Sequence, residues 1–268
     1  MSQKSSSPQA TNSVSQVLTP DRREVLAYYK GGFAALADAL GAEIVRLGGQ
    51  VRLNARVTAI ETDGRHVRAV TAGAEPVPVH AAVATPALPQ IADLVNGHAP
   101  PEFIERLLRV RYLANVCLVL ELDRSLSETY WLNVADPPFP FVGIIEHTNF
   151  EPPESYGGRH IVYLSKYLPE SDPLYRMPTN ELMAFSLPHI QRMFPAFDRS
   201  WIINCHVWRA PYAQPIMERH YSKIVPGLTT PLDNLFISTM AQVYPEDRGT
   251  NYAIREGWAA AEAVSSRL

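Results

Sequence analysis

The sequence is poor in cysteine and in glycine. Its 268 residues include two cysteines, Cys117 and Cys205, which are too few for a disulfide framework or a cysteine metal cluster. A reducing compartment is therefore expected, and we predict a cytoplasmic protein. Glycine, with 14 residues, is outnumbered by proline, with 23. This is the reverse of average usage and indicates stiff, extended connections.

A charge excess and a long apolar run are also missing. The 24 basic and 27 acidic side chains give a net charge of −3 at pH 7, whereas nucleic-acid-binding domains normally carry a basic excess. The apolar runs, such as those at 116–120 and 161–164, fall far short of the roughly 20 residues of a membrane helix. We therefore predict no nucleic-acid partner and no membrane span. The polar segment 1–22 has no signal-peptide core and is predicted to be disordered.

Familiar catalytic motifs do not occur in the sequence. There is no GxSxG nucleophile elbow, no HExxH zinc pattern, no GxxxxGK[ST] phosphate loop and no GxGxxG dinucleotide turn. The sequence thus predicts no metal site and no self-contained catalytic triad, and it leaves the catalytic residues unknown.

The sequence does contain the material for a globular α+β fold. Apolar residues make up 46% and charged residues 19% of the chain, the balance of a protein with a hydrophobic core. At the two ends, apolar periodicity and turn residues predict helices and strands in mixed order. These are a helix at 33–47, strands at 51–57, 67–70 and 77–85 with a hairpin turn at Asp63-Gly64, a helix at 88–95, a strand at 235–239, a loop at 240–251 and a helix at 252–268.

The middle of the chain has a different pattern, in which proline-rich breaks separate strand-like segments. Strands are predicted at 112–122, 141–146, 161–167 and 202–208, and a helix at 179–194. Pro188 predicts a kink in this helix or a late start. Leu182, Phe185, His189 and Met193 are spaced along one of its sides. An antiparallel sheet covered by one or two helices is expected here.

Read together, the two ends of the chain resemble one family. The segments GGQVRLNARVTAIETDGRHVRAV, VHAAVATPALPQIADL and NLFISTMAQVYPEDRGTNYAIREGWAAAEAV are similar to the FAD-dependent amine oxidase superfamily, which includes protoporphyrinogen oxidases and phytoene desaturases. The stretch YPEDRGTNYAIREG most resembles members associated with polysaccharide biosynthesis. The resemblance implies the C-terminal part of an FAD-linked amine-oxidase-like fold. Its partial FAD-binding layer would comprise 23–100 and 230–268, and an antiparallel-sheet substrate domain with helices would comprise 101–229.

The resemblance also implies which residues approach FAD. Val57 matches the position whose backbone meets the adenine, and Ser238, Thr239 and Met240 match the turn near the ribityl chain. The last helix would open at Asn251, Tyr252 and Ala253, and its free N–H groups suit the pyrimidine edge of the flavin. Two plainer interpretations stay open, because Val57 also suits a core strand and the last segment suits an ordinary amphipathic helix.

Substrate contacts are implied in VWRAPYAQP, which resembles the family segment passing the flavin face. The candidates are Trp208, Arg209, Tyr212, Gln214 and, further on, Tyr244. Aromatic side chains there can wall a pocket against water, although a tryptophan-anchored corner of the core explains the segment equally well. The stretch containing Tyr244, Glu246, Asp247 and Arg248 either borders the flavin or forms a solvated charged loop.

One element of the family is missing from this sequence. Family members begin with a strand, a GxGxxG turn and a helix that hold the FAD pyrophosphate. Three explanations stay open: a separate N-terminal FAD-binding subunit or a homo-oligomer completes the site, the chain is a fragment, or the fold has lost the cofactor. We expect the chain to bind FAD poorly alone. We also expect it, alone or as part of a larger enzyme, to oxidise a small-molecule substrate by hydride transfer to flavin. The alternative is a non-catalytic interaction or scaffolding protein.

Overall fold

A computed structural model describes residues 28–136 and 138–267. The predicted disordered segment 1–22 lies outside the described residues. The chain divides into two compact units between Leu53 and Asn54, and each is described by itself. In the described residues, no helix combines the length and the apolar character needed to cross a membrane.

The described part of the first unit contains one helix, α1 (Gly32–Arg46), which confirms the helix predicted at 33–47. It follows Gly31, whose φ of 90° favours glycine, and it ends at Leu47. None of its residues is buried, and the predicted apolar positions Leu40 and Ile44 are exposed.

The strand predicted at 51–57 is wrong over most of its length. Asn54 adopts a left-handed conformation, with φ of 55°, and such a residue interrupts an extended run. The strand therefore begins only at Val57, as β1 (Val57–Thr62).

In the second unit, β1, β2 (Val67–Ala72) and β3 (Pro76–Pro78) form an antiparallel sheet. The hairpin turn at Asp63-Gly64 is confirmed. Gly64 has φ of 88°, and the Asp63 carboxylate accepts the backbone N–H groups of Arg65 at 2.9 Å and His66 at 2.7 Å. Together with β3, this hairpin of β1 and β2 forms one layer of what we call the small domain.

The second layer of the small domain joins segments far apart in the sequence. Strand β4 (Ala82–Ala84) pairs in parallel with β10 (Leu235–Ile237). The single strand predicted at 77–85 is therefore wrong, since β3 and β4 belong to different sheets. The strand predicted at 235–239 is confirmed in its buried part, 235–237.

Four helices complete the small domain: α2 (Leu88–Val95), α3 (Pro101–Arg109), α6 (Tyr221–Ile224) and α7 (Thr250–Ser265). The predicted helix at 88–95 is confirmed, and α7 begins two residues before the predicted start. Leu107 of α3 and Tyr221 of α6 are buried in one cluster with Leu88 and Ile237. Helices α3 and α6 thus pack with the small domain, although both lie within 101–229, the segment assigned to the substrate domain from the sequence.

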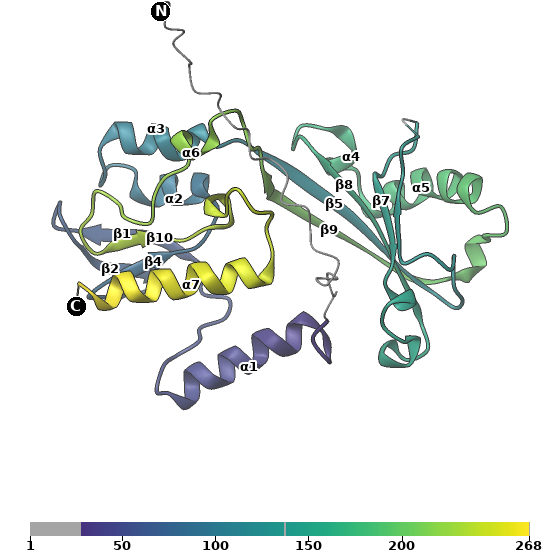
Figure 1. The fold of residues 1–268 in the computed structure, drawn as a ribbon, viewed down its shortest axis with the longest axis horizontal. Coiled ribbons are helices and arrows are strands. Elements are labelled where there is room, and N and C mark those ends of the chain that lie inside the picture. The colour runs from purple at the N-terminus through teal and green to yellow at the C-terminus, as the bar shows by residue number, and fades with distance from the viewer. Residues whose placement is uncertain (1–27, 137, 268) are drawn as a thin grey trace, which may run out of the picture. The chain divides into compact units, whose positions relative to one another are not determined.

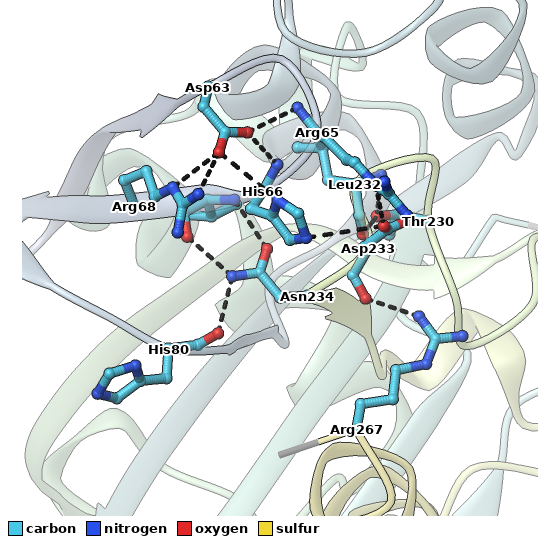
Figure 2. Close-up of polar contacts among 11 residues, drawn as sticks. Asp63, Arg65, His66, Arg68, His80, Thr230, Leu232, Asp233, Asn234 and Arg267 are labelled. Carbon is cyan, nitrogen blue, oxygen red and sulfur yellow. Dashed lines mark hydrogen bonds and ion pairs between the residues drawn. The ribbon is translucent and has the colours of Figure 1, made fainter.

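Polar contacts tie the hairpin to the segment before β10 (Figure 2). The Asn234 amide oxygen accepts the N–H of Val67 at 2.7 Å, and its NH₂ group donates to the carbonyls of Val67 and His80, both at 2.8 Å. Arg65 pairs with Asp233 at 2.5 Å, and Arg267, just after α7, donates to the Asp233 carbonyl at 2.6 Å. The Asn234 side-chain amide therefore satisfies both the backbone N–H and the backbone carbonyl of Val67, as a neighbouring strand would.

The middle of the chain forms a five-stranded antiparallel sheet, which we call the sheet domain (Figure 1). The strand order is β6 (Trp131–Asn133), β7 (Gly143–Glu146), β8 (His160–Leu168), β5 (Tyr112–Leu122) and β9 (Ile202–Pro215). Helices α4 (Pro173–Arg176) and α5 (Thr179–Met193) contribute to its core. The antiparallel sheet with helices is confirmed, and the strand predicted at 202–208 runs on to Pro215.

Helix α5 departs from the prediction in one respect. It starts at Thr179 and continues through Pro188, so the late start is wrong. Its buried residues are Leu182, Met183, Ser186 and Ile190, whereas Phe185, placed on the predicted inner side, is 41% exposed. Positions 182, 186 and 190 follow the 3.6-residue period of a helix and form its buried face. The aromatic Phe185 does not belong to this face.

Candidate functional site

A cavity of about 190 Å³ lies where the small domain meets the end of β9. Residues from five places in the chain line it. They include Thr85 after β4, Tyr112 at the start of β5, Tyr212 of β9, Thr239 and Met240 after β10, and Arg248 before α7. The structure thereby brings together Tyr212, predicted for the substrate, with Thr239 and Met240, predicted for the flavin.

The turn after β10 is fixed by its own hydrogen bonds. Thr239 Oγ1 accepts the N–H of Ala241 at 3.3 Å, and the Thr239 N–H donates to the Gln242 amide oxygen at 2.7 Å. The Ser238 N–H donates to the carbonyl of Ala84 at 3.0 Å, which holds the turn against β4. Met240 is 38% exposed and offers its side chain to the cavity, while Ser238 is half-buried and does not line it.

Two tyrosines form an aromatic wall of the cavity. The rings of Tyr112 and Tyr212 meet edge to face with centroids 5.5 Å apart. The Tyr112 hydroxyl accepts the N–H of Leu88 at 3.4 Å, and burial raises the pKa of Tyr112 to about 12. Burial outweighs the hydrogen bond from Leu88, which by itself lowers the pKa, and so keeps this phenol uncharged at neutral pH.

Tyr244, another aromatic residue predicted for the substrate, does not line the cavity. Its ring packs against Tyr221 with centroids 5.4 Å apart. Tyr221 donates its hydroxyl to the carbonyl of Ala241 at 2.8 Å, and burial raises the pKa of Tyr221. Tyr244 thus supports the turn that carries Met240, and it is itself 41% exposed.

Gln214 reaches the cavity through Arg248. The Arg248 guanidinium donates to the Gln214 amide oxygen and to the Tyr167 hydroxyl, the latter at 3.4 Å. Its central carbon lies 5.8 Å from the centroid of the Tyr167 ring. Within 28–136 and 138–267, no carboxylate lies within ion-pair distance of Arg248. Asp247 turns its carboxylate back to the Arg248 backbone N–H, at 2.8 Å.

Trp208 and Arg209 point to opposite faces of the sheet, because side chains alternate along a strand. Trp208 is 68% exposed, so the core corner considered for it is wrong. Arg209 donates to the carbonyl of Tyr175 at 2.6 Å and to that of Met177. It therefore fastens the end of α4 to the sheet and does not line the cavity.

Helix α7 opens with backbone N–H groups that have no partner inside the helix. Its first helical hydrogen bond runs from the Ala253 N–H to the Gly249 carbonyl, at 3.0 Å, and Gly249 supplies no side-chain cap. The N–H groups of Thr250, Asn251 and Tyr252 come before this bond. Asn251 and Ala253 are exposed and Tyr252 is half-buried, so all three predicted residues lie in the first turn.

Charged side chains brace the same turn. Arg255 lies 4.9 Å from the centroid of the Tyr252 ring and pairs with Glu246 at 3.1 Å. The hydrogen bond from Arg255 lowers the pKa of the Glu246 carboxyl. Glu246 therefore serves the geometry of α7 and stays ionised at neutral pH.

Val57 lines a second cavity, of about 490 Å³, together with Thr58, Pro86 and Gln90 among others. Val57 is 38% exposed, so the core-strand interpretation does not hold for it. The second cavity lies where β1 approaches the start of α2.

A comparison with known families decides the affiliation of the chain. The model of the flavin containing amine oxidoreductase family matches residues 4–265. The chain belongs to this family. No curated protein matches it at a significant level.

Solved structures of two oxidases and of an oxidoreductase share the fold at low sequence identity. Cyclohexylamine oxidase from Brevibacterium oxydans superposes with a TM-score of 0.64 at 14% identity, over 88% of this chain and 53% of that one. A putrescine oxidase with redesigned cofactor binding gives 0.67 at 12% identity, over 89% and 53%. An oxidoreductase from Methanosarcina mazei gives 0.60 at 17% identity, over 78% and 49%. The chain therefore spans about half the length of these structures.

The family affiliation implies a flavin, and the cavity's surroundings fit one. The first turn of α7 offers backbone N–H groups, and Met240 and Ala241 line the cavity with apolar side chains. Both features suit a planar flavin ring with an electron-rich pyrimidine edge. Within the described residues, no cluster of three or more His, Cys, Asp or Glu side chains could hold a metal ion.

Tyr112 and Arg248 are among the lining residues that were not selected as candidates from the sequence. Tyr112 has the same period-2 pattern as the rest of β5, so nothing in the sequence distinguishes it from a sheet residue. Arg248 stands in the PEDR stretch, where a charged loop was an equally good interpretation. The sequence signal for Arg248 is its position beside the flavin motif. This signal identifies a site residue only when the spatial neighbours of Arg248 are known.

Proposed function

We propose that this chain is the substrate-side part of a flavin-dependent oxidoreductase that oxidises a small molecule by hydride transfer to FAD. The observation that carries the proposal is the 190 Å³ cavity. It joins the turn of Thr239 and Met240 to Tyr212, although the sequence between them includes α6 and β10. A flavin, when bound, supplies the hydride acceptor, so the chain needs no nucleophile of its own.

The residues proposed to hold FAD follow from the family resemblance and from their surroundings. Val57 would meet the adenine in the second cavity. Ser238, Thr239 and Met240 would pass the ribityl chain, and Asn251, Tyr252 and Ala253 would present the start of α7 to the pyrimidine edge. The internal hydrogen bonds of Thr239 would hold the shape of the turn that passes the ribityl chain.

The remaining side chains of the site would receive the substrate and keep water out. Tyr112 and Tyr212 supply an uncharged aromatic wall, and Trp208 extends the apolar surface on the same sheet. Gln214 orients Arg248. Tyr244 supports the turn from behind. An apolar, enclosed site strengthens the electrostatic interactions that position a donor next to a ring.

The FAD pyrophosphate would be held by residues outside this sequence. The GxGxxG turn that usually holds it does not occur here. A separate N-terminal FAD-binding subunit would supply such a site, and weak binding of FAD by this chain alone follows. The scarcity of cysteine supports a cytoplasmic setting.

Flavin binding is the test of this proposal. The chain is purified alone and together with the product of the neighbouring reading frame, and FAD is titrated while the visible absorbance and the fluorescence of the flavin are followed. We expect bound flavin at least in the second preparation. Met240→Ala should weaken binding several-fold. Met217→Ala, which removes an equally exposed methionine (38% each) that does not line the cavity, should leave it unchanged.

The alternative is a non-catalytic interaction or scaffolding protein, and the missing glycine turn favours it. A folded chain that stays colourless in both preparations would support this alternative. Reduction of the flavin by an added substrate would exclude it.

A further inference from the structure

Among the described residues that line the 190 Å³ cavity, Arg248 is the only one with a charged side chain. We infer that the substrate of this site carries a carboxylate, which Arg248 binds. The chemical fate of the substrate rests on the proposed function, whereas its recognition by Arg248 rests on the charges around the cavity alone.

The positive charge of Arg248 is not compensated within the described part of the chain. Other arginines near the site have carboxylate partners: Arg255 pairs with Glu246 and Glu256, at 3.1 and 3.0 Å, and Arg109 pairs with Glu218 at 2.9 Å. Arg248 is held by two neutral side chains instead, Gln214 and Tyr167. A half-buried guanidinium with neutral neighbours attracts an anion, because part of its hydration is lost without a counter-charge.

The hydrogen bonds of Arg248 leave room for such a partner. A guanidinium has five N–H donors in a planar fork, and the amide oxygen of Gln214 and the hydroxyl of Tyr167 take one at each terminal nitrogen. Three donors stay available in the described structure. A carboxylate accepts two parallel N–H groups from such a fork, so Gln214 and Tyr167 pre-orient Arg248 for it.

The class of anion follows from charge and size. One cation lines the cavity, which matches a single negative charge better than the two charges of a phosphate monoester. The volume of about 190 Å³ corresponds to about six water molecules at roughly 30 Å³ each, so the group is small. A cationic amine is disfavoured, since no lining carboxylate would offset its repulsion from Arg248.

Equilibrium binding of three probes to the full chain tests the inference. Benzoate, benzylamine and inorganic phosphate are titrated by calorimetry, with and without saturating FAD, into the wild-type protein and into Arg248→Gln, Arg248→Lys and Arg199→Gln. The exposed Arg199 lies on the sheet domain away from the cavity, and its replacement makes the same change in net charge as Arg248→Gln. Thermal melts of every variant report its folding.

We expect the wild-type protein to prefer benzoate over both other probes. Arg248→Gln should weaken benzoate binding about 10- to 100-fold, the range for losing a hydrogen-bonded charge. Arg248→Lys should retain part of the affinity, and Arg199→Gln should retain all of it. If Arg248→Gln does not fold, the order of the three probes in the wild type and the lysine variant still decides.

Tighter binding of benzylamine or phosphate than of benzoate would overturn the inference, as would undiminished benzoate binding by folded Arg248→Gln. Failure of the chain to bind FAD bears on the proposed function alone. The preference for benzoate can still be measured in that case, because Arg248, Gln214 and Tyr167 all belong to this chain.

Discussion

The two faces of the five-stranded sheet differ in what they contact. The buried face carries Val116, Leu118, Leu120 and Leu122 of β5, all fully buried in the core of the sheet domain. The open face carries the residues between them, which are only half-buried. Cys117 and Val119 of this face lie opposite Trp208 and His206 of β9.

The open face changes character along its length. At one end, Glu121 is paired with Arg159 and with His206, the latter at 3.0 Å. At the other end, Tyr167 lies beside Arg248 and therefore next to the cavity. One face thus stabilises the fold, and the other leads to the proposed site. Adjacent residues of β5 therefore contribute to different functions, one to the core and the next to the face that leads to the cavity.

The largest effect should come from the buried face. Leu118→Ala removes a side chain with 0% exposure from the centre of β5, and such truncations lower the free energy of unfolding by about 2–5 kcal/mol. Urea unfolding of the full chain, followed by circular dichroism, measures the change.

Val119→Ala is the matched control on the open face. It shortens the next side chain of the same strand, and because that position is half-buried the loss should be below about 1 kcal/mol. Equal losses from both variants would show that the two faces are covered alike.

The reactivity of the Cys117 thiol measures how accessible the open face is to a reagent in solution. Burial raises the pKa of the Cys117 thiol from 9.0 to about 11, so its reactive thiolate at pH 8 should be about a hundredfold scarcer than that of an ordinary cysteine. In Cys205→Ser, the rate of alkylation by iodoacetamide, read by mass spectrometry, should keep rising toward pH 11. The urea-unfolded chain, with an ordinary thiol, is the control.

The same thiol links stability to pH. The folded chain holds the Cys117 proton more tightly than the unfolded chain does, so stability is fully present below pH 9 and should decrease as the pH rises from about 9 to about 11.

Trp208 lies opposite Cys117 on β9, and Trp208→Ala should uncover the thiol and speed its alkylation. An unchanged rate would mean that other groups cover it.

The variant Arg209→Gln tests whether Arg209 stabilises the buried face of the sheet and has no part in the proposed site. Arg209→Gln loses charge-assisted hydrogen bonds to the carbonyls of Tyr175 and Met177, which should lower the free energy of unfolding by about 1.5–3 kcal/mol. The benzoate preference should be unaffected. A loss of benzoate binding without a loss of stability would place Arg209 in the site after all.

The segment around Arg209 also shows how far the sequence could predict the site. VWRAPYAQP was recognised as a unit, and Tyr212 and Gln214 do reach the cavity or its arginine. The alternation that separates Trp208 from Arg209 was implicit in the strand prediction, but which face is buried depends on α4 and α5, which come from elsewhere in the chain. The turn at Thr239 could be located from the family motif, because its contacts with Ala241 and Gln242 are local in the sequence.

The fold follows the same division between local and distant contacts. The hairpin at Asp63-Gly64 and helix α2 rest on turn and capping residues within a few positions, so the sequence predicts both. The 77–85 segment was misjudged because β4 pairs with β10, about 150 residues away, and no local pattern records such a partner. Asn54, a single residue with positive φ, ended an otherwise convincing strand pattern.

The smallest effect on stability should come from Trp208. Its side chain is 68% exposed, so Trp208→Ala should change the free energy of unfolding by no more than about 0.5 kcal/mol, despite the size of the group removed. Trp201→Ala is the comparison, because Trp201 packs against the sheet core, meets Phe197 edge to face at 5.8 Å and lies under Arg124, and its loss should cost clearly more. A large loss from Trp208→Ala, measured by the same urea unfolding, would mean that the open face carries part of the core.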